Sequence, residues 1–417
     1  MRASLRYREM WLAYGMLLPP FLIVAAIVLF PVLANFWISF KTVGLAELRA
    51  PTPIVRERVK LDQDTGRVEV QYRLRNSSQK SPILDVTLRD ALAPGLVLQE
   101  PTNGCQADGD TLLCRFGDWQ PGHRERLNLA FQAPDAFFAS GVDLKASEPE
   151  MAGRSVNPLT SLDFTLDNFR LVFSQREFWT VLKVSLAYTI FGTLGALILG
   201  LFAALLLNTK FRGRGFLRGL FLFPYVSPVI AVAFTWVFFL DPFSGVLNAL
   251  GIHLGVVESP VNFLGTRRLP ISVLGLTFNF PLALATVIAF ESWRYFPLSF
   301  LFILARLQAL PSDLYEAAEV DGATPLQKFW YITFPQLVGI LSILFMLRFI
   351  WTFNKFDDIF LLTGGAAGTR TFTVNVYEQG FALANLGGGA AVSVVIFFVL
   401  AVFMVFYFAF LPKGEKM

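Results

Sequence analysis

The chain has 417 residues and a formal net charge of +4; hydrophobic types make up 54% of it, charged types only 16%, and phenylalanine occurs 44 times. A soluble globular domain averages about 25% charged residues. This composition therefore excludes an ordinary soluble protein and indicates a membrane protein.

Six apolar stretches are candidate spans, since a chain needs about 20 residues to cross a hydrocarbon layer ~30 Å thick. Four contain no charged residue: 10–40, 184–207, 219–240 and 386–411. The other two contain charges: 270–310, with Glu291, Arg294 and Arg306, and 338–353, with Arg348. We expect an all-α polytopic membrane fold with six spans. Dividing 270–310 into two spans, or treating 270–281 as a re-entrant segment, is the alternative.

Basic residues predict how the spans are oriented. Arg2, Arg6 and Arg8 precede the first stretch. Its uncharged run far exceeds the ~7–15 apolar residues of a secretory signal and no cleavage site follows, so we expect a retained span. Lys and Arg beside spans stay in the cytoplasm. Both termini are then cytoplasmic. The other basic positions placed inside are Lys210, Arg212, Arg214, Arg218, Lys413 and Lys416, while Arg267 and Arg268 fall outside.

The segment 45–165 differs from the rest because polar and charged residues return in it. RVEVQYRLRN at 67–76 alternates apolar and polar residues, as a half-buried strand does. Further strand-like runs are ILDVTLRD, GLVLQ, TLLCRF and RLNLAFQ, separated by Pro-Gly or Asp-Gly turns at 94–95, 108–109 and 121–122. We expect an extracytoplasmic antiparallel β-sandwich inserted after the first span.

The turns of this segment resemble those of the small Ig-like repeat domains of bacterial surface proteins. The pattern N-S-S, D-x-L-x-P-G-L and G-x-x-x-P-G occurs at 76–78, 90–96 and 117–122. The resemblance implies an Ig-like domain.

The chain has two cysteines, Cys105 and Cys114, which flank the hairpin dipeptide Asp108-Gly109. A disulfide suits the oxidising compartment that the predicted topology gives this segment, so we expect one in preference to two reduced thiols. Zinc is not expected, because His123 and His253 are the only histidines.

Nucleotide-hydrolysis motifs are absent from the sequence. No G-x-x-x-x-G-K-[ST] occurs, and the Gly-rich run TGGAAGTRT at 363–371 lacks the lysine and the preceding strand that a phosphate cradle requires. No H-E-x-x-H, cysteine cluster or nucleophile elbow occurs either. We therefore expect neither an enzyme nor a cofactor on this chain.

The loop 311–335, cytoplasmic in a six-span topology, carries the signals of two short helices. The first is predicted to start with Ser312 as N-cap and to end at Gly322, where glycine permits a sharp bend. T-P-L-Q at 324–327 is a capping box with proline at the first helical position. The second helix is expected to run until Pro335 opens the next span.

The composition of this loop favours docking against a protein over resting on lipid. Ala317 and Ala318 leave a surface that permits close approach, and Phe329 and Trp330 form a hydrophobic knob. A helix that lies on lipid prefers basic residues beside its aromatics. Here the acids Asp313, Glu316, Glu319 and Asp321 outnumber the bases Arg306 and Lys328.

The pattern E-A-A-x-x-D-G-A followed by F-x-x-I-x-x-P resembles the coupling motif of the membrane subunits of binding-protein-dependent ABC importers. It is matched by Glu316, Ala317, Ala318, Asp321, Gly322, Ala323, Phe329, Ile332 and Pro335. The likeness continues in LDNFRLVF, LFPYVSPVI and FDDIFLLTGG, and covers the first stretch and the chain from about residue 163 onward. The loop is most similar to that of sugar permeases of the maltose type, although the extra N-terminal spans of the enteric maltose-type subunit are absent.

This resemblance implies a type I importer permease that works by alternating access. Two six-span subunits, here a heterodimer, would enclose a cavity near the bilayer midplane. Two ATPase subunits, which hold ATP and Mg, would bind the coupling loop. An extracytoplasmic binding protein would deliver the solute. The expected domains are 1–44 with the first span, the insertion 45–165, and a five-helix core 166–417.

Polar and aromatic residues inside the later spans are candidates for contact with the solute, because burying polar groups is costly without partners or water. They are Glu291, Trp293, Arg294, Arg348, Trp351, Thr352 and Asn354. The indole rings suit the apolar face of a sugar, and hydroxyls or amides suit its OH groups. The alternative is a structural ion pair between Glu291 and Arg294, spaced i, i+3, with Arg348 nearby.

The preferred function is thus the permease subunit of an ATP-driven importer for a sugar, of the maltose or trehalose type. A cavity with net positive charge would instead suit an anionic or other small polar solute, such as glycerol phosphate. A non-transporting membrane receptor or anchor is the third interpretation, but an anchor has no need of charged residues within its spans.

Overall fold

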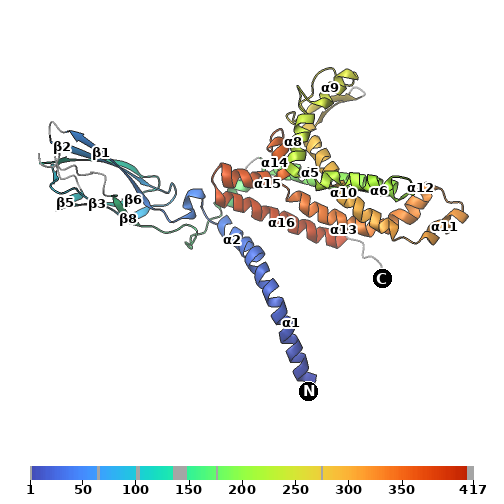
Figure 1. Cartoon of the computed structure of the whole chain (residues 1–417), viewed down its shortest axis with the longest axis horizontal. Coiled ribbons are helices and arrows are strands. Elements are labelled where there is room, and N and C mark those ends of the chain that lie inside the picture. Colours follow the sequence, from blue (N-terminus) through green and yellow to red (C-terminus); the bar gives the residue numbers. More distant parts are fainter. Residues whose placement is uncertain are drawn as a thin grey trace. The chain divides into compact units, whose positions relative to one another are not determined.

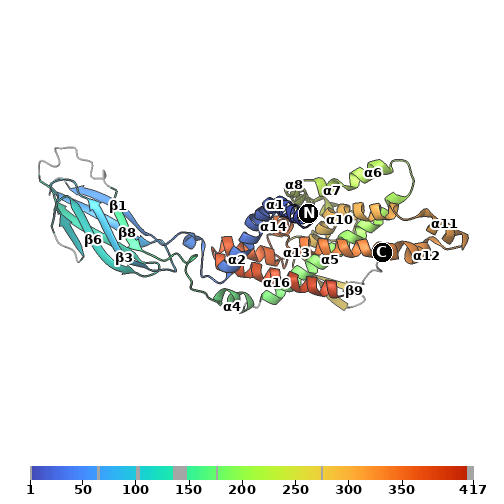
Figure 2. The ribbon, with the colours of Figure 1, turned by 90° about the horizontal axis from the view of Figure 1, so that it is seen from below.

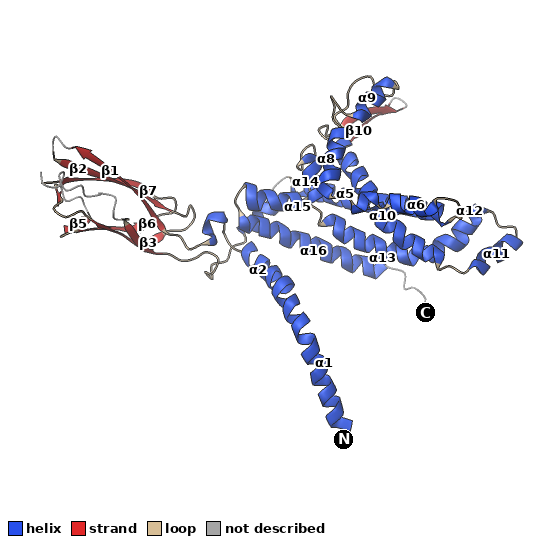
Figure 3. Ribbon diagram, in the orientation of Figure 1, coloured by secondary structure: helices blue, strands red, loops and turns tan. Residues whose placement is uncertain are grey.

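The computed structural model describes residues 2–62, 66–99, 104–134, 148–174, 177–273 and 276–410. The chain divides into two compact units. One comprises residues 1–171 with 379–391, and the other comprises 172–378 with 392–417. Strands make up much of the first unit, and helices most of the second (Figures 1 and 3).

The first unit contains two four-stranded sheets, ordered β1-β2-β7-β4 and β5-β6-β3-β8, whose paired strands are antiparallel. The strands are β1 Pro53–Asp62, β2 Arg67–Asn76, β3 Ile83–Ala91, β4 Val97–Leu98, β5 Cys105–Asp108, β6 Thr111–Trp119, β7 Arg124–Gln132 and β8 Glu150–Arg154. Both sheets contribute to one hydrophobic core, which Tyr72 and Leu129 enter from one sheet and Leu88 and Trp119 from the other. The predicted runs fall on β2, β3, β4, β6 and β7, whereas β1, β5 and β8 were not predicted.

The turns of these sheets are held by the residues of the N-S-S, D-x-L and P-G pattern. Asn76 Nδ2 donates to the carbonyls of Ser81 (2.9 Å) and Gln120 (3.1 Å), and its Oδ1 accepts from Ser78 N (2.8 Å). Gly95, Gly109 and Gly122 all have positive φ. In the core, Tyr72 Oη donates to the carboxylate of Asp90. Burial, with this carboxylate beside the hydroxyl, raises the pKa of Tyr72 well above its ordinary value.

The hairpin β5–β6 confirms the expected disulfide. The register sets Cys105 directly opposite Cys114, with Asp108 opposite Thr111 at the turn. A disulfide joins the two cysteines, and both are buried in the core shared by the sheets.

The first unit also contains the N-terminal helix. It runs through α1 Arg2–Val24, a π-helical turn Ala25–Leu29 and α2 Phe30–Ser39, and a 3-10 turn, Leu45–Leu48, follows it. Its apolar part, Glu9–Ser39, has 31 residues. This length confirms the stretch 10–40 as a helix long enough to span a membrane.

The remaining helices run from α4 to α16. Their bounds are α4 Asp167–Ser174, α5 Phe178–Asn208, α6 Arg214–Phe221, α7 Phe223–Val226, α8 Val229–Phe239, α9 Val246–His253, α10 Leu282–Gln308, α11 Ser312–Val320, α12 Pro325–Lys328, α13 Phe334–Phe353, α14 Asp357–Thr363, α15 Phe372–Tyr377 and α16 Leu386–Phe410. Among the described residues, five helices are long and apolar enough to cross a membrane, or six if a bent pair counts as one span. The last predicted stretch ends at residue 411, which lies outside the described residues, as do Lys413 and Lys416.

Helices α5, α10 and α13 pack side by side around one core (Figure 2). Ala204, Phe300 and Leu337 are buried in it, one from each helix. Glycine allows α5 and α10 to approach closely: a Cβ at Gly200 would lie 2.6 Å from Ser299 Cβ and 2.8 Å from Phe300 N. The spans predicted at 184–207 and 338–353 fall within α5 and α13.

Two span predictions were wrong in detail. The stretch 219–240 is not one helix: Arg214–Val226 and Val229–Phe239 meet at 92°. Ser227 is extended (ψ 143°), because the ring of Pro228 disfavours helical geometry in the residue before it. The stretch 270–310 is helical only from Leu282 onward; before it, β9 Leu269–Val273 and β10 Leu276–Phe280 form an antiparallel hairpin. The window therefore contains one long helix, not two.

Candidate functional site

Glu291 lies in the middle of α10 and is fully buried. Tyr188 Oη of α5 donates to it at 3.0 Å, and Thr352 Oγ1 of α13 at 2.9 Å. Arg348 of α13 completes the set with an ion pair. A buried carboxylate is tolerated only when it is paired and hydrogen-bonded. The side chain of Glu291 therefore connects α10 to α5 and α13 through two hydrogen bonds and an ion pair.

A second ion pair follows the end of α13. Lys355 Nζ lies 3.5 Å from Asp358 Oδ2, and the Asp358 side chain is fully buried. Tyr295 of α10 connects the two pairs through its ring, whose centroid lies 3.3 Å from Lys355 Nζ and 4.4 Å from Arg348 Cζ. Such cation–π contacts strengthen when they are desolvated. The two acids of this cluster, Glu291 and Asp358, are thus paired with two bases, Arg348 and Lys355.

Arg294 contacts the cluster at Tyr295, whose hydroxyl accepts from Arg294 Nε at 3.2 Å, and its remaining partners lie at the bend before α8. It donates to the carbonyls of Pro224 (3.2 Å) and Ser227 (3.0 Å). These carbonyls lie where α7 ends and have lost helical partners, so the guanidinium satisfies them. The i, i+3 pair of Glu291 with Arg294, considered from the sequence, is therefore wrong. Arg294 instead stabilises the bend between α7 and α8.

Neither predicted tryptophan has a hydrogen bond to Glu291, Arg348 or Thr352 among the described residues. Trp293 packs against Trp236, with ring centroids 5.4 Å apart, and both line an apolar cavity of about 720 Å³. Trp351 is 49% exposed on α13. Both lie in the same helices as the cluster but on other faces.

Asn354 lines a separate cavity of about 430 Å³. Its polar neighbours there are Thr373 and Ser393, and Val376, Ile396, Phe397 and Leu400 form the apolar wall. Pockets of a few hundred Å³ with few polar groups among apolar ones are typical small-molecule sites. This cavity offers amide and hydroxyl groups, which suit a polyhydroxylated solute.

Four members of the buried cluster were missed in the sequence: Tyr188, Tyr295, Lys355 and Asp358. Lys355 and Asp358 carried a usable signal, since they are charged residues beside an apolar stretch. The tyrosines carried none, because tyrosine is common in membrane helices and only the fold shows which one meets a carboxylate.

The loop 311–335 folds as a helix, a sharp turn and a second helix. Helix α11 begins at Ser312, and Pro311, not Ser312, takes the N-cap position. Gly322 has φ +76°, the left-handed conformation that ends the first helix. Thr324 and Gln327 form the predicted capping box, with Thr324 N donating to Gln327 Oε1 at 2.8 Å.

The second helix does not end at Pro335, contrary to the prediction. Residues Pro325–Phe353 form one helix of 29 residues. A π-helical turn, Phe329–Thr333, lies just before Pro335. A proline ring clashes with the carbonyl four residues earlier, and the wider π turn relieves this clash. The loop is therefore continuous with the span that follows.

Polar contacts within the loop fix the two helices against each other. Lys328 Nζ lies 2.7 Å from Glu319 Oε1, and the hydroxyls of Tyr315 and Thr333 are 2.9 Å apart. At the same time Val320 is 89% exposed and Tyr331 80% exposed. A rigid turn that presents apolar side chains to solvent is typical of a protein-docking surface.

The predicted coupling residues are mostly accessible on this turn. Exposed are Glu316, Ala317, Asp321, Gly322 and Pro335, and half-buried are Ala318, Ala323, Phe329 and Ile332.

Residues 196–414 match the family described as binding-protein-dependent transport system inner membrane component. The trehalose/maltose transport system permease protein MalF of Thermococcus litoralis is 38% identical over 243 residues, which cover 58% of this chain and 77% of that protein. The inner membrane ABC transporter permease protein YcjO of Escherichia coli is 34% identical, covering 59% and 79%. The sn-glycerol-3-phosphate transport system permease protein UgpA of Agrobacterium fabrum is 32% identical, covering 60% and 80%.

A solved structure of a bacterial ABC transporter involved in the import of the acidic polysaccharide alginate shares the fold. Its TM-score is 0.54 at 22% identity, and the match covers 62% of this chain and 86% of that one. Fold and sequence thus agree on one membrane-embedded architecture. The chain belongs to the family of binding-protein-dependent transport system inner membrane components.

Proposed function

We propose that this multi-pass inner-membrane protein is the permease subunit of an ATP-driven importer that moves a sugar delivered by a binding protein. The observation that carries the proposal is the loop 311–335. It is a rigid helical turn that exposes apolar residues and is continuous with α13, which carries Arg348. A force applied to the loop therefore reaches the buried cluster through a single helix.

Each predicted coupling residue has a role in this proposal. Glu316 is exposed on α11 and would meet basic groups in the cleft of an ATPase subunit. Asp321 and Gly322 would set the bend, and the alanines Ala317, Ala318 and Ala323 would permit close approach. Phe329, Ile332 and Pro335 would hold the second helix against the first.

A sugar is the proposed solute. The cavity at Asn354 offers one amide and two hydroxyl-bearing side chains, Thr373 and Ser393, beside an apolar wall. The relatives named for trehalose and maltose point the same way. Trp293, Arg294, Trp351 and Thr352 remain candidates along the pathway, and Glu291 with Arg348 would act as its buried structural support. An anionic solute such as glycerol phosphate is the second candidate, because Arg294 faces carbonyls and no carboxylate among the described residues.

The assembly and topology belong to the same proposal. The permease would pair with a second permease subunit, two ATPase subunits holding ATP and Mg, and an extracytoplasmic binding protein. Both termini would be cytoplasmic. Residues 1–44 would form the first span, 45–165 an extracytoplasmic Ig-like β-sandwich, and 166–417 the permease core. The disulfide of Cys105 and Cys114 supports an oxidising location for the insertion.

Uptake by the reconstituted transporter tests the proposal. The full complex in liposomes, with ATP inside and loaded binding protein outside, should accumulate labelled maltose or trehalose. Glu316→Lys should leave the complex in the membrane but abolish ATP-dependent uptake, whereas Lys210→Gln, in another predicted cytoplasmic loop, should not. Uptake of glycerol 3-phosphate in place of either sugar would favour the second candidate. Normal uptake by Glu316→Lys would refute the coupling role.

A further inference from the structure

The sheet β1-β2-β7 carries an array of arginines on the side that faces away from the core. The register sets Arg56 opposite Arg73 and Arg73 opposite Arg126, so one row of three crosses the sheet. In the next row Arg75 lies opposite Arg124. We call the following exposed residues the arginine face: Arg56, Arg58, Arg73, Arg75, Arg124 and Arg126.

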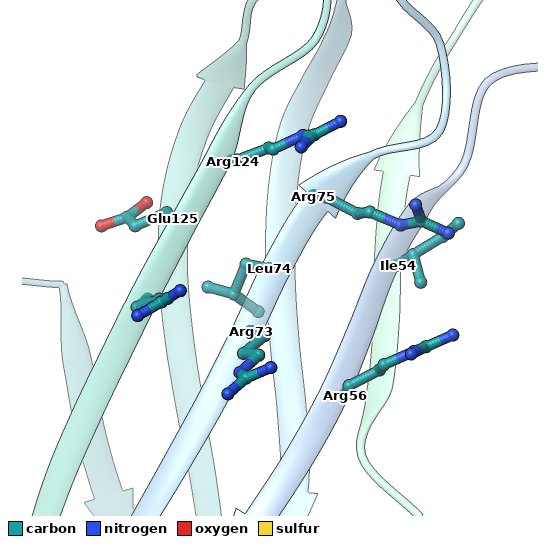
Figure 4. A pocket seen from close by; sticks show the side chains of 8 residues that line it. Ile54, Arg56, Arg73, Leu74, Arg75, Arg124 and Glu125 are labelled. Carbon is teal, nitrogen blue, oxygen red and sulfur yellow. The ribbon is translucent and has the colours of Figure 1, made fainter.

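No ion pair or hydrogen bond of these six side chains occurs within the part of the chain that the structure describes. Figure 4 shows Arg56, Arg75 and Arg124 extending to the same side of their strands, whereas Glu125 points away from them. Glu125 pairs instead with His123, at 3.2 Å. The acid next to the array in sequence therefore does not neutralise it.

Like charges directly opposite each other destabilise a sheet. The far end of the same strands avoids this cost, because Lys60 lies opposite Glu69 and Asp62 opposite Arg67. A face that only had to be soluble would use such alternating signs throughout. The arginine rows are therefore a local stability cost that an anionic partner would offset.

The array lies along a shallow depression of about 390 Å³, lined by Ile54, Leu74, Glu125 and five members of the arginine face. A second depression of about 310 Å³ follows on the same face, where Gln71 Nε2 donates to Asn128 Oδ1 at 2.9 Å. Outward residues repeat every ~7 Å along a strand, and neighbouring strands are ~4.8 Å apart. The arginines thus repeat at regular intervals in the first depression, whereas the second is lined by both signs of charge, Arg58, Lys60, Arg67 and Glu69.

The chemistry of this face selects the partner. Arginine binds carboxylate, sulfate and phosphate groups through bidentate hydrogen bonds, which lysine cannot form. The outward positions of β1, β2 and β7 next to the arginines include no aromatic residue. A membrane-docking face inserts aromatic or aliphatic side chains, and a protein interface has an apolar centre. The amides of Gln71 and Asn128 beside the array suit sugar hydroxyls.

We propose that the arginine face binds a linear anionic polysaccharide, whose acidic groups contact the arginine rows and whose hydroxyls contact the neighbouring amides. This binding is independent of solute transport, because the face belongs to the unit that contains the sheets and not to the helices of the buried cluster.

The test uses the full chain in nanodiscs of phosphatidylcholine and fluorescent polygalacturonate as the probe. Wild type should bind, and affinity should fall steeply as salt rises, since several charges are neutralised at once. Arg56→Gln/Arg73→Gln/Arg126→Gln should weaken binding about tenfold or more. The matched control Lys80→Gln/Arg89→Gln/Arg115→Gln removes the same charge from exposed positions outside the arginine face and should bind as wild type does.

Three outcomes would overturn the proposal: no binding by wild type, equal loss in both triple variants, or equal binding of neutral dextran. Binding to phosphatidylglycerol nanodiscs without binding to polygalacturonate would assign the face to a membrane surface instead. Preference for polyphosphate over polygalacturonate would show that the amides of Gln71 and Asn128 do not help to select a sugar. If the row variant fails to fold, Arg75→Gln/Arg124→Gln provides the same comparison from the adjacent row.

Discussion

Glu291 and Arg348 form an ion pair between α10 and α13 across 57 positions of sequence, and both side chains are buried. Removing one partner of such a pair leaves an uncompensated charge, which costs about 3–5 kcal/mol. Replacing both by neutral groups avoids that cost.

We therefore expect Arg348→Met to lower the thermal unfolding temperature of the detergent-solubilised protein strongly. Glu291→Gln should lower it too, and the double variant should be more stable than Arg348→Met alone. Size-exclusion chromatography after heating measures the effect. Additive losses in the double variant would show that the two side chains do not depend on each other.

The sequence predicted the Glu291 cluster only in part. It identified Glu291, Arg348 and Thr352 as polar groups within apolar stretches, but it placed Arg294 beside Glu291 on grounds of spacing. The bend at Ser227-Pro228 decides the partner of Arg294, because it frees carbonyls that a straight helix would have used. Hydropathy cannot detect that bend, since the whole window from 219 to 240 is apolar.

The strands, like the cluster, were predicted only in part. β2 was predicted with its observed bounds, because its alternation runs over ten residues. β5 has four residues, three of them exposed, and its position depends on pairing with β6. A strand whose position depends on its partner shows no recognisable alternation of apolar and polar residues in the sequence.

Gly200 allows close contact of α5 with α10, so Gly200→Ala should destabilise the helical unit. The new methyl group would lie 2.8 Å from the backbone nitrogen of Phe300, and the helices must separate. Overpacking of this kind costs about 1–3 kcal/mol. Gly339→Ala in α13 is the matched control, because a Cβ there meets nothing within 4 Å and alanine favours helix. Equal melting of both variants would contradict the close packing.

The cysteines provide a direct test of the compartment. In the purified protein denatured without reductant, maleimide should label neither Cys105 nor Cys114, and after reduction of the denatured protein it should label both. Cys105→Ser should leave one thiol that maleimide labels in the denatured protein, and should destabilise the sheets by up to about 3 kcal/mol, because the unfolded chain is no longer restrained. Labelling of both thiols in the denatured protein without reductant would show that the disulfide is absent and would remove its support for an oxidising compartment.

The raised pKa of Tyr72 predicts how the stability of the sheets depends on pH. Its pKa is raised in the folded state by burial and by Asp90, whereas in the unfolded chain it is about 10. Below pH ~10 the hydroxyl is protonated in both states, so its contribution to stability is fully present. Above pH ~10 only the unfolded chain loses the proton, which lowers the free energy of unfolding by about 1.4 kcal/mol at pH ~11.

Tyr72→Phe should abolish this part of the alkaline loss, although at pH ~9 it should already be less stable by about 1 kcal/mol, because the hydrogen bond to Asp90 is missing. Pulse proteolysis with subtilisin in increasing urea, scored by cleavage within 53–132, measures the midpoint at both pH values. The wild-type midpoint should fall further between the two pH values than that of the variant. Parallel declines would mean that Tyr72 ionises normally in the folded protein, and that the contact with Asp90 does not protect its proton.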